Sequence, residues 1–115
     1  MTSETIAAQD AARRLRALLS GGVGPGLPRR RRDQWILLHA AALEVLPAGG
    51  RELDEPAINA RLKAWLESLG PRVELDHVSV RRALVDEGFV ERATDGAVYR
   101  PSRAHERQVT FEEPR

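Results

Sequence analysis

The sequence has no cysteine and few aromatic residues, and both shortages exclude classes of protein. Without cysteine the chain forms no disulfide, has no thiolate ligand for zinc and has no thiol nucleophile. Two tryptophans, one tyrosine and two phenylalanines are too few for a platform on which single-stranded nucleic acid stacks. No apolar run approaches the roughly 18 residues of a transmembrane helix. The first residues include acids and lack the regions of a secretory signal, so we expect a cytoplasmic protein.

Neither sign of charge is in excess, since 18 basic residues stand against 17 acidic ones and the net charge is +1. A uniformly basic nucleic-acid-binding protein is therefore excluded, although a local basic patch is not. The length of 115 residues indicates one small domain.

The first two predicted helices differ in how much of their surface is apolar. Residues 2–20 form one apolar stripe at helical spacing, with Ser3 as the expected N-cap. A glycine-rich segment, 21–28, predicts a flexible connector. Residues 29–46 are apolar on nearly all sides of the next helix. We therefore expect that helix to be covered by the first helix or by a second copy of the chain.

The next two predicted helices have clear start signals. Residues 54–69 and 76–87 each begin at an aspartate, a residue that caps helix N-termini. The segment 51–53 before the first of them predicts a very short strand. After the last helix, Asp95-Gly96 separates the runs 89–92 and 97–100, a pattern typical of a β-hairpin.

Helix, short strand, helix, turn, helix and hairpin is the element order of a winged helix-turn-helix. We therefore expect a mainly α fold with a small β-hairpin, a winged helix-turn-helix plus an extra N-terminal helix. Residues 1–22 are the expected N-terminal helix and dimerisation element, and residues 27–101 the winged-helix domain. Residues 102–115 are the expected flexible tail, with one short strand at 108–111.

Three blocks of sequence carry a resemblance to a known family. The blocks are Leu27-Pro28 before four arginines, Glu55-Pro56-Ala57-Ile58-Asn59-Ala60-Arg61-Leu62, and Arg81-Arg82-Ala83-Leu84-Val85-Asp86-Glu87-Gly88-Phe89 with Gly96-Ala97-Val98-Tyr99 after it. They resemble an uncharacterised bacterial domain family whose members occur alone or appended to ArsR-type regulators. Val80 and Val90 stand where that family's pattern has leucine. The resemblance implies a winged-helix fold and a role associated with transcription, and it implies no reaction or ligand.

The candidate nucleic-acid-binding residues are seven arginines and one serine. They are Ser79, Arg82, Arg81, Arg72, Arg92, Arg100, Arg29 and Arg30. Ser79 and Arg82 are expected nearest to the bases, because an arginine on a recognition helix pairs with guanine or holds a phosphate. Arg72, Arg92 and Arg100 are expected to hold phosphates, and Arg29 and Arg30 to contact the DNA backbone.

Each of these arginines has a structural alternative. Arg82 and Asp86 are four residues apart on one helix face and favour an ion pair. Arg81 and Arg82 together fit a brace between helix and hairpin. Arg92 and Arg100 fit ion pairs with Glu91 or Asp95, and the arginines of 29–32 fit a solvated turn.

No residue pattern indicates an enzyme, a metal or a cofactor. The three histidines, His39, His77 and His105, lack metal-ligand spacing, and no serine lies in a nucleophile elbow. We predict a DNA-binding transcription regulator that binds duplex DNA as a homodimer through the N-terminal helix and the helix 29–46. The alternative is a winged-helix protein–protein interaction module without DNA binding, which the low net charge and the acids of 76–87 favour.

Overall fold

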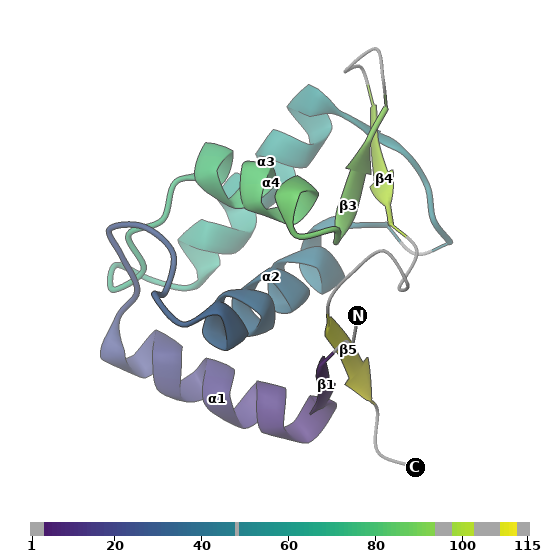
Figure 1. Cartoon of the computed structure of the whole chain (residues 1–115). Coiled ribbons are helices and arrows are strands. Elements are labelled where there is room, and N and C mark those ends of the chain that lie inside the picture. Colours follow the sequence, from purple (N-terminus) through teal and green to yellow (C-terminus); the bar gives the residue numbers. More distant parts are fainter. Residues whose placement is uncertain (1–3, 48, 94–97, 103–108, 113–115) are drawn as a thin grey trace.

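The computed structural model describes residues 4–47, 49–93, 98–102 and 109–112 (Figure 1). Within these residues the chain forms four helices and two small sheets. The helices are α1 (Ala8–Gly21), α2 (Arg31–Val45), α3 (Glu55–Ser68) and α4 (His77–Asp86). The strands are β1 (Glu4–Ala7), β2 (Leu53–Asp54), β3 (Val90–Arg92), β4 (Val98–Pro101) and β5 (Val109–Glu112). The fold is thus mixed α/β, with more helix than strand.

Helix α2 is the centre of the hydrophobic core. Four consecutive side chains, Trp35, Ile36, Leu37 and Leu38, are all buried, so the first half of the helix is covered on nearly all sides, whereas Leu43 farther along is 70% exposed. In Figure 1, α1 lies on one side of α2 and the α3–α4 pair lies on the other, and all three of these helices contact α2. Helices α1, α3 and α4 of the same chain therefore supply most of the cover that the apolar surface of α2 requires.

The starts of α3 and α4 follow from their capping residues. The carboxylate of Asp54 accepts a hydrogen bond from the backbone N–H of Ala57 at 2.9 Å, and Pro56 lies in the first turn of α3. The carboxylate of Asp76 accepts a hydrogen bond from the backbone N–H of Ser79 at 2.8 Å. Both predicted caps are confirmed, because each aspartate satisfies an N–H that has no partner within its helix.

The predicted hairpin strands are present as β3 and β4. They pair antiparallel, with Glu91 opposite Arg100 and Arg92 opposite Tyr99. The predicted short strand before α3 is also present as β2, which pairs antiparallel with the other edge of β4. The turn residues Asp95 and Gly96 lie outside the described residues. Strand β4 is therefore the middle strand of the sheet and connects the hairpin to the start of α3.

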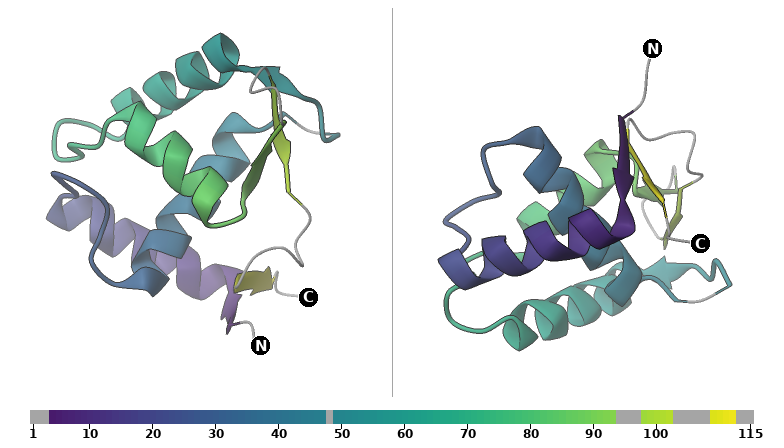
Figure 2. Two further views of the ribbon diagram at one scale, coloured as in Figure 1. Left: turned by 45° about the horizontal axis from the view of Figure 1, so that its top comes forward. Right: turned by 90° about the horizontal axis from the view of Figure 1, so that it is seen from below.

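The N-terminal segment differs from the prediction. Residues Glu4–Ala7 form β1 in place of the first turns of a helix, α1 begins at Ala8 without a side-chain cap, and Ser3 lies outside the described residues. Strand β1 pairs in parallel with β5, which buries Ile6 and Val109 (Figure 2). This pairing joins the two ends of the chain, so local periodicity could not reveal it. The short strand predicted at 108–111 lies at Val109–Glu112, so this part of the predicted flexible tail is packed against β1.

The connector between α1 and α2, predicted to be flexible, is held by the loop between α3 and α4. Val23 is buried and exchanges backbone hydrogen bonds with Arg72 and Glu74 at 2.9 and 2.7 Å. At Gly24, with φ +110°, an added Cβ would lie 2.7 Å from the carbonyl oxygen of Glu74. The close approach of two backbones at this point requires glycine.

Candidate functional site

The candidate site is the concave surface between α4 and the β3–β4 hairpin. Helix α4 buries Val80 and Leu84 and exposes Ser79, Arg82 and Asp86. Gly88 follows α4 with φ +78°, and β3 begins two residues later. This tight connection places the hairpin beside the C-terminal half of α4 (Figure 2). The surface therefore combines side chains from α4 and from the hairpin.

One cavity on this surface is rich in arginine, and we call it the arginine cavity. Its volume is about 310 Å³, and its lining residues are Arg81, Arg82, Val85, Asp86, Arg92 and Tyr99. Three arginines thus face a single carboxylate, in a chain whose net charge is only +1. The cavity concentrates positive charge on a protein that is close to neutral.

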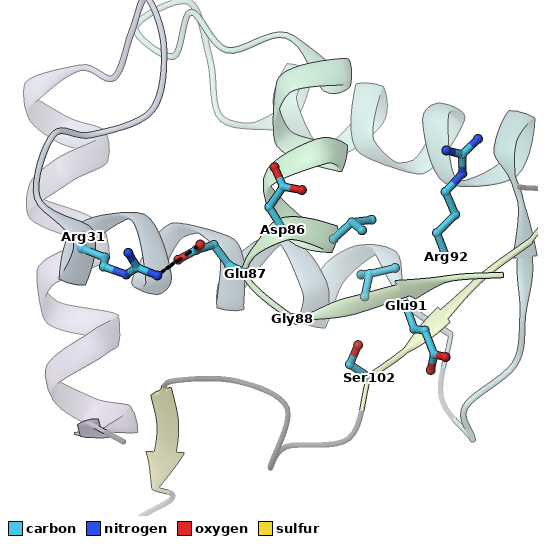
Figure 3. A pocket seen from close by; sticks show the side chains of 9 residues that line it. Arg31, Asp86, Glu87, Gly88, Glu91, Arg92 and Ser102 are labelled. Atoms are coloured by element: carbon cyan, nitrogen blue, oxygen red, sulfur yellow. Dashed lines mark hydrogen bonds and ion pairs between the residues drawn. The ribbon is translucent and has the colours of Figure 1, made fainter. Parts of the chain in front are cut away.

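A second cavity adjoins the first and has the opposite balance of charge. Its volume is about 410 Å³, and its lining residues are Arg31, Val85, Asp86, Glu87, Gly88, Val90, Glu91, Arg92 and Ser102 (Figure 3). Three carboxylates here face two arginines. Since the two cavities share Val85, Asp86 and Arg92, the charge changes sign along one continuous surface.

Arg82 is exposed on α4. Within the described part of the chain it has no hydrogen-bond or ion-pair partner, and the i,i+4 pair with Asp86 that the sequence allowed is not formed. Asp86 is exposed and likewise has no such partner there. The guanidinium of Arg82 is therefore available to a ligand.

Arg81 points into the protein and braces α4 against α3. Its guanidinium donates a hydrogen bond to Asn59 Oδ1 and lies 3.8 Å from the carboxylate of Glu55, and only 15% of the side chain is exposed. The same guanidinium lies 5.9 Å from the centre of the Tyr99 ring. Arg81 therefore braces α4 against α3, whereas the alternative drawn from the sequence was a brace between α4 and the hairpin.

Tyr99 of β4 contacts Glu55, the same glutamate that lies beside Arg81. It is 2% exposed, and its hydroxyl donates a hydrogen bond to Glu55 Oε1 at 2.9 Å. Burial raises the pKa of the Tyr99 hydroxyl above its ordinary value, and the hydrogen bond to Glu55 acts in the same direction. Neither Glu55 nor Asn59 is among the candidate binding residues that the sequence indicates. Their i,i+4 spacing on one helix was the signal that they share a face.

The two hairpin arginines have different environments. Arg92 is exposed and lies 5.8 Å from the centre of the Tyr99 ring, with no carboxylate partner within the residues described. Arg100 lies 3.2 Å from Glu91 and 3.5 Å from Glu52. The hydrogen bond with Glu91 raises the pKa of Arg100 above its ordinary value. Within the described residues, the charge of Arg100 is thus compensated by carboxylates and that of Arg92 is not.

The remaining predicted residues do not join this site. The Oγ–H of Ser79 donates to Asp76 Oδ2 at 2.8 Å, so it belongs to the cap of α4. Arg72 donates a hydrogen bond to the carbonyl of Ser20 at 2.8 Å and ties the α3–α4 loop to α1. Arg29 and Arg30 are exposed and precede α2. Of the eight predicted residues, the structure brings Arg81, Arg82 and Arg92 together in one cavity.

Glu87, at the end of α4, is held by α2. It accepts a hydrogen bond from Trp35 Nε1–H at 2.8 Å and lies 3.1 Å from the guanidinium of Arg31 (Figure 3). Arg32, the next arginine of the basic segment, lies 3.4 Å from Glu4. Two of the four arginines in 29–32 are therefore compensated by carboxylates from other elements.

The described residues contain no group of three or more histidine, aspartate or glutamate side chains that could hold a metal ion. None of their helices is long and apolar enough to cross a membrane.

Comparison with known proteins gives one match. Residues 26–101 match the model of a family described as "Uncharacterized protein conserved in bacteria (DUF2087)". No curated protein and no solved structure matches the chain. The matched segment contains α2, α3, α4 and the β2–β4–β3 sheet, and it excludes α1, β1 and β5. The arginine cavity therefore lies wholly within the family segment.

Proposed function

Because the chain belongs to the bacterial family DUF2087 through residues 26–101, we propose that its function resides in this segment, as a winged helix-turn-helix that binds duplex DNA. In this proposal the protein is a transcription regulator. Helix α4 is the recognition helix, and the β3–β4 hairpin is the wing.

The order and pairing of the elements support this fold assignment. Helices α2, α3 and α4 pack on one another, and β2, which lies between α2 and α3 in the chain, pairs with the hairpin strand β4. A helix-turn-helix whose hairpin is held at one side by such a short strand is the arrangement of a winged helix. It leaves one face of α4 exposed beside the hairpin.

One observation carries the proposal of DNA binding. In the arginine cavity, Arg82 from α4 and Arg92 from β3 both lack a carboxylate partner within the described residues. Arginines left uncompensated on a recognition helix and a wing are suited to contact DNA, where most of the affinity comes from phosphates.

Fluorescence anisotropy with a pool of labelled genomic duplex fragments tests the proposal. We expect binding at low salt whose affinity falls steeply as salt rises, because phosphate contacts release counterions. Arg82→Ala should weaken binding, whereas Arg16→Ala, which removes the same charge from the exposed surface of α1, should not. Absence of binding to any duplex at low salt by the intact protein would overturn the proposal.

A protein–protein interaction module is the second candidate. The observation that favours it is the cavity beside β3, in which Asp86, Glu87 and Glu91 outnumber the arginines. Such a surface suits a basic segment of a partner protein better than a phosphate backbone. Under this alternative the protein binds no duplex at low salt, and Asp86→Asn weakens the binding of a basic peptide.

The homodimer remains a prediction. The surface on which it would form is now the exposed apolar part of α1 and α2, rather than an uncovered core. Since α1 covers α2 within one chain, the dimer is not needed to complete the core. Leu43 on α2 is 70% exposed, beside an apolar groove between α1 and α2. Sedimentation equilibrium of the wild type and of Leu43→Ser measures whether two copies associate there.

A further inference from the structure

We propose that Arg82 and Arg92 together hold one phosphate group in the arginine cavity, and that Tyr99 positions Arg92 for this contact. The inference rests on the proposed DNA binding and deepens it. It names the DNA backbone, rather than a base edge, as what the cavity recognises.

The two arginines belong to different elements of the fold. Arg82 extends from α4 and Arg92 from β3, and both line the same cavity. Each guanidinium offers several N–H donors in a planar fork that matches the oxygens of a phosphate. Arg81 adds a third positive charge to the lining and is already held by Asn59 and Glu55. A phosphate in this cavity would therefore meet charge from both sides and from a fixed group.

No carboxylate of the described residues pairs with Arg92. Glu91 and Arg92 are neighbours on β3 and point to opposite sides of the strand (Figure 3). On its own side of the strand, Glu91 is paired with Arg100 across the hairpin, at 3.2 Å. The carboxylate nearest to Arg92 in the sequence is thus directed away from it and engaged by another arginine.

Arg92 lies over the aromatic ring of Tyr99. The guanidinium of Arg92 is 5.8 Å from the centre of the Tyr99 ring, within the range of a cation–π interaction. Tyr99 is itself fixed by burial and by its hydrogen bond to Glu55. A cation–π contact restricts the side chain of Arg92 without occupying its N–H donors. Tyr99 therefore acts as a positioning residue, since it reaches the phosphate only through Arg92.

Asp86 opposes the phosphate in the same cavity. It is exposed, and no arginine of the described chain pairs with it. Its negative charge lowers the affinity of the cavity for any anion. We therefore expect Asp86→Asn to strengthen the binding of duplex DNA by several-fold, an effect opposite to that of the arginine variants.

The salt dependence of duplex binding tests whether the two arginines share one phosphate. For B-DNA the slope of log K against log salt changes by about 0.9 for each phosphate that the protein neutralises. Anisotropy titrations compare the wild type, Arg82→Ala, Arg92→Ala and the double variant. We expect each single variant, and also the double variant, to reduce the magnitude of this negative slope by no more than about 1. A fall of about 2 in the double variant, or an unchanged slope and affinity in Arg92→Ala, would overturn the inference and leave the proposed function standing.

The role of Tyr99 is tested by two variants that differ only in the aromatic ring. Tyr99→Phe keeps the ring and should leave the salt slope of binding unchanged. Tyr99→Leu removes the ring and should give the slope of Arg92→Ala, with circular dichroism used to select a temperature at which the variant is folded. Equal slopes for the wild type and a folded Tyr99→Leu would remove Tyr99 from the proposal.

A titration with pyrophosphate distinguishes a free phosphate from a DNA backbone as the ligand. If the wild type binds no duplex, so that the proposed function fails, NMR signals of the arginine Nε–H groups are followed during addition of pyrophosphate. Shifts of Arg82 and Arg92 that disappear in the alanine variants would support the cavity as a site for a free phosphate. An absence of shifts would overturn the cavity site as well.

Discussion

Arg14 and Asp33 form a bidentate ion pair that joins α1 to α2. The guanidinium of Arg14 donates hydrogen bonds to both carboxylate oxygens of Asp33, at 2.9 and 3.0 Å. Asp33 is only 6% exposed and is the buried charged residue of the described chain. The pair fixes α1 on α2, the helix at the centre of the core. Helix α1 lies outside the family segment, and α2 lies within it.

Removal of the Asp33 carboxylate should destabilise the protein. Asp33→Ala takes away two charge-assisted hydrogen bonds at a buried position, and we expect the free energy of unfolding to fall by about 1–3 kcal/mol. Asp10→Ala is the control, because Asp10 forms an exposed pair with Arg13 at 3.6 Å, which is worth at most about 1 kcal/mol. Urea unfolding measures both values. Equal losses in the two variants would contradict the role of the Arg14–Asp33 pair.

The same pair predicts a pH dependence of stability. The hydrogen bond with Arg14 lowers the pKa of Asp33 below its ordinary value in the folded protein. A depressed folded pKa adds stability above the unfolded pKa of about 3.9, and this stability is lost as pH falls through the folded pKa. We expect the difference in unfolding free energy between wild type and Asp33→Asn to be largest near neutral pH and to shrink below about pH 4. The comparison is needed because the pKa of Asp76 is also lowered, by its hydrogen bonds with Ser79.

The cap of α4 should contribute measurably to stability. Asp76→Ala leaves the backbone N–H of Ser79 without its acceptor, and the expected loss is about 1 kcal/mol in the free energy of unfolding. Asp76→Asn retains a side-chain oxygen that accepts the same hydrogen bond, so most of the stability should remain. Thermal unfolding followed by circular dichroism compares the two, and a loss in Asp76→Asn as large as in Asp76→Ala would show that charge, not capping, is responsible.

Gly24 should not tolerate a side chain. Gly24→Ala adds a Cβ 2.7 Å from the backbone of Glu74, at φ +110°, and we expect a loss of about 1–3 kcal/mol. Gly26→Ala is a matched control, because Gly26 also has a positive φ, +84°, but a Cβ there meets no atom within 4 Å. Unfolding in urea should therefore show the larger loss for Gly24→Ala, and the reverse order would mean that the close approach to Glu74 is unimportant.

The sequence was most informative where structure depends on near neighbours. The caps at Asp54 and Asp76 and the hairpin strands were predictable, because an N-cap bonds three residues ahead and a hairpin turn joins adjacent strands. The first helix was predicted too long, because β1 gains its hydrogen bonds from β5 at the far end of the chain. Local helix propensity gives way to that pairing, which also buries Ile6.

The candidate site was predictable only as a set of arginines. The order of elements along the chain already implies that the arginines of α4 and of the hairpin lie near one another, since the hairpin follows α4 directly. Which of these arginines have partners depends on the packing: within the described residues, Arg81 is bound by Asn59, Arg100 pairs with Glu52 and Glu91, and Arg82 and Arg92 have no hydrogen-bond or ion-pair partner. The physical reason is that an ion pair depends on distances between side chains of different elements, and those distances are set by packing rather than by spacing along the chain.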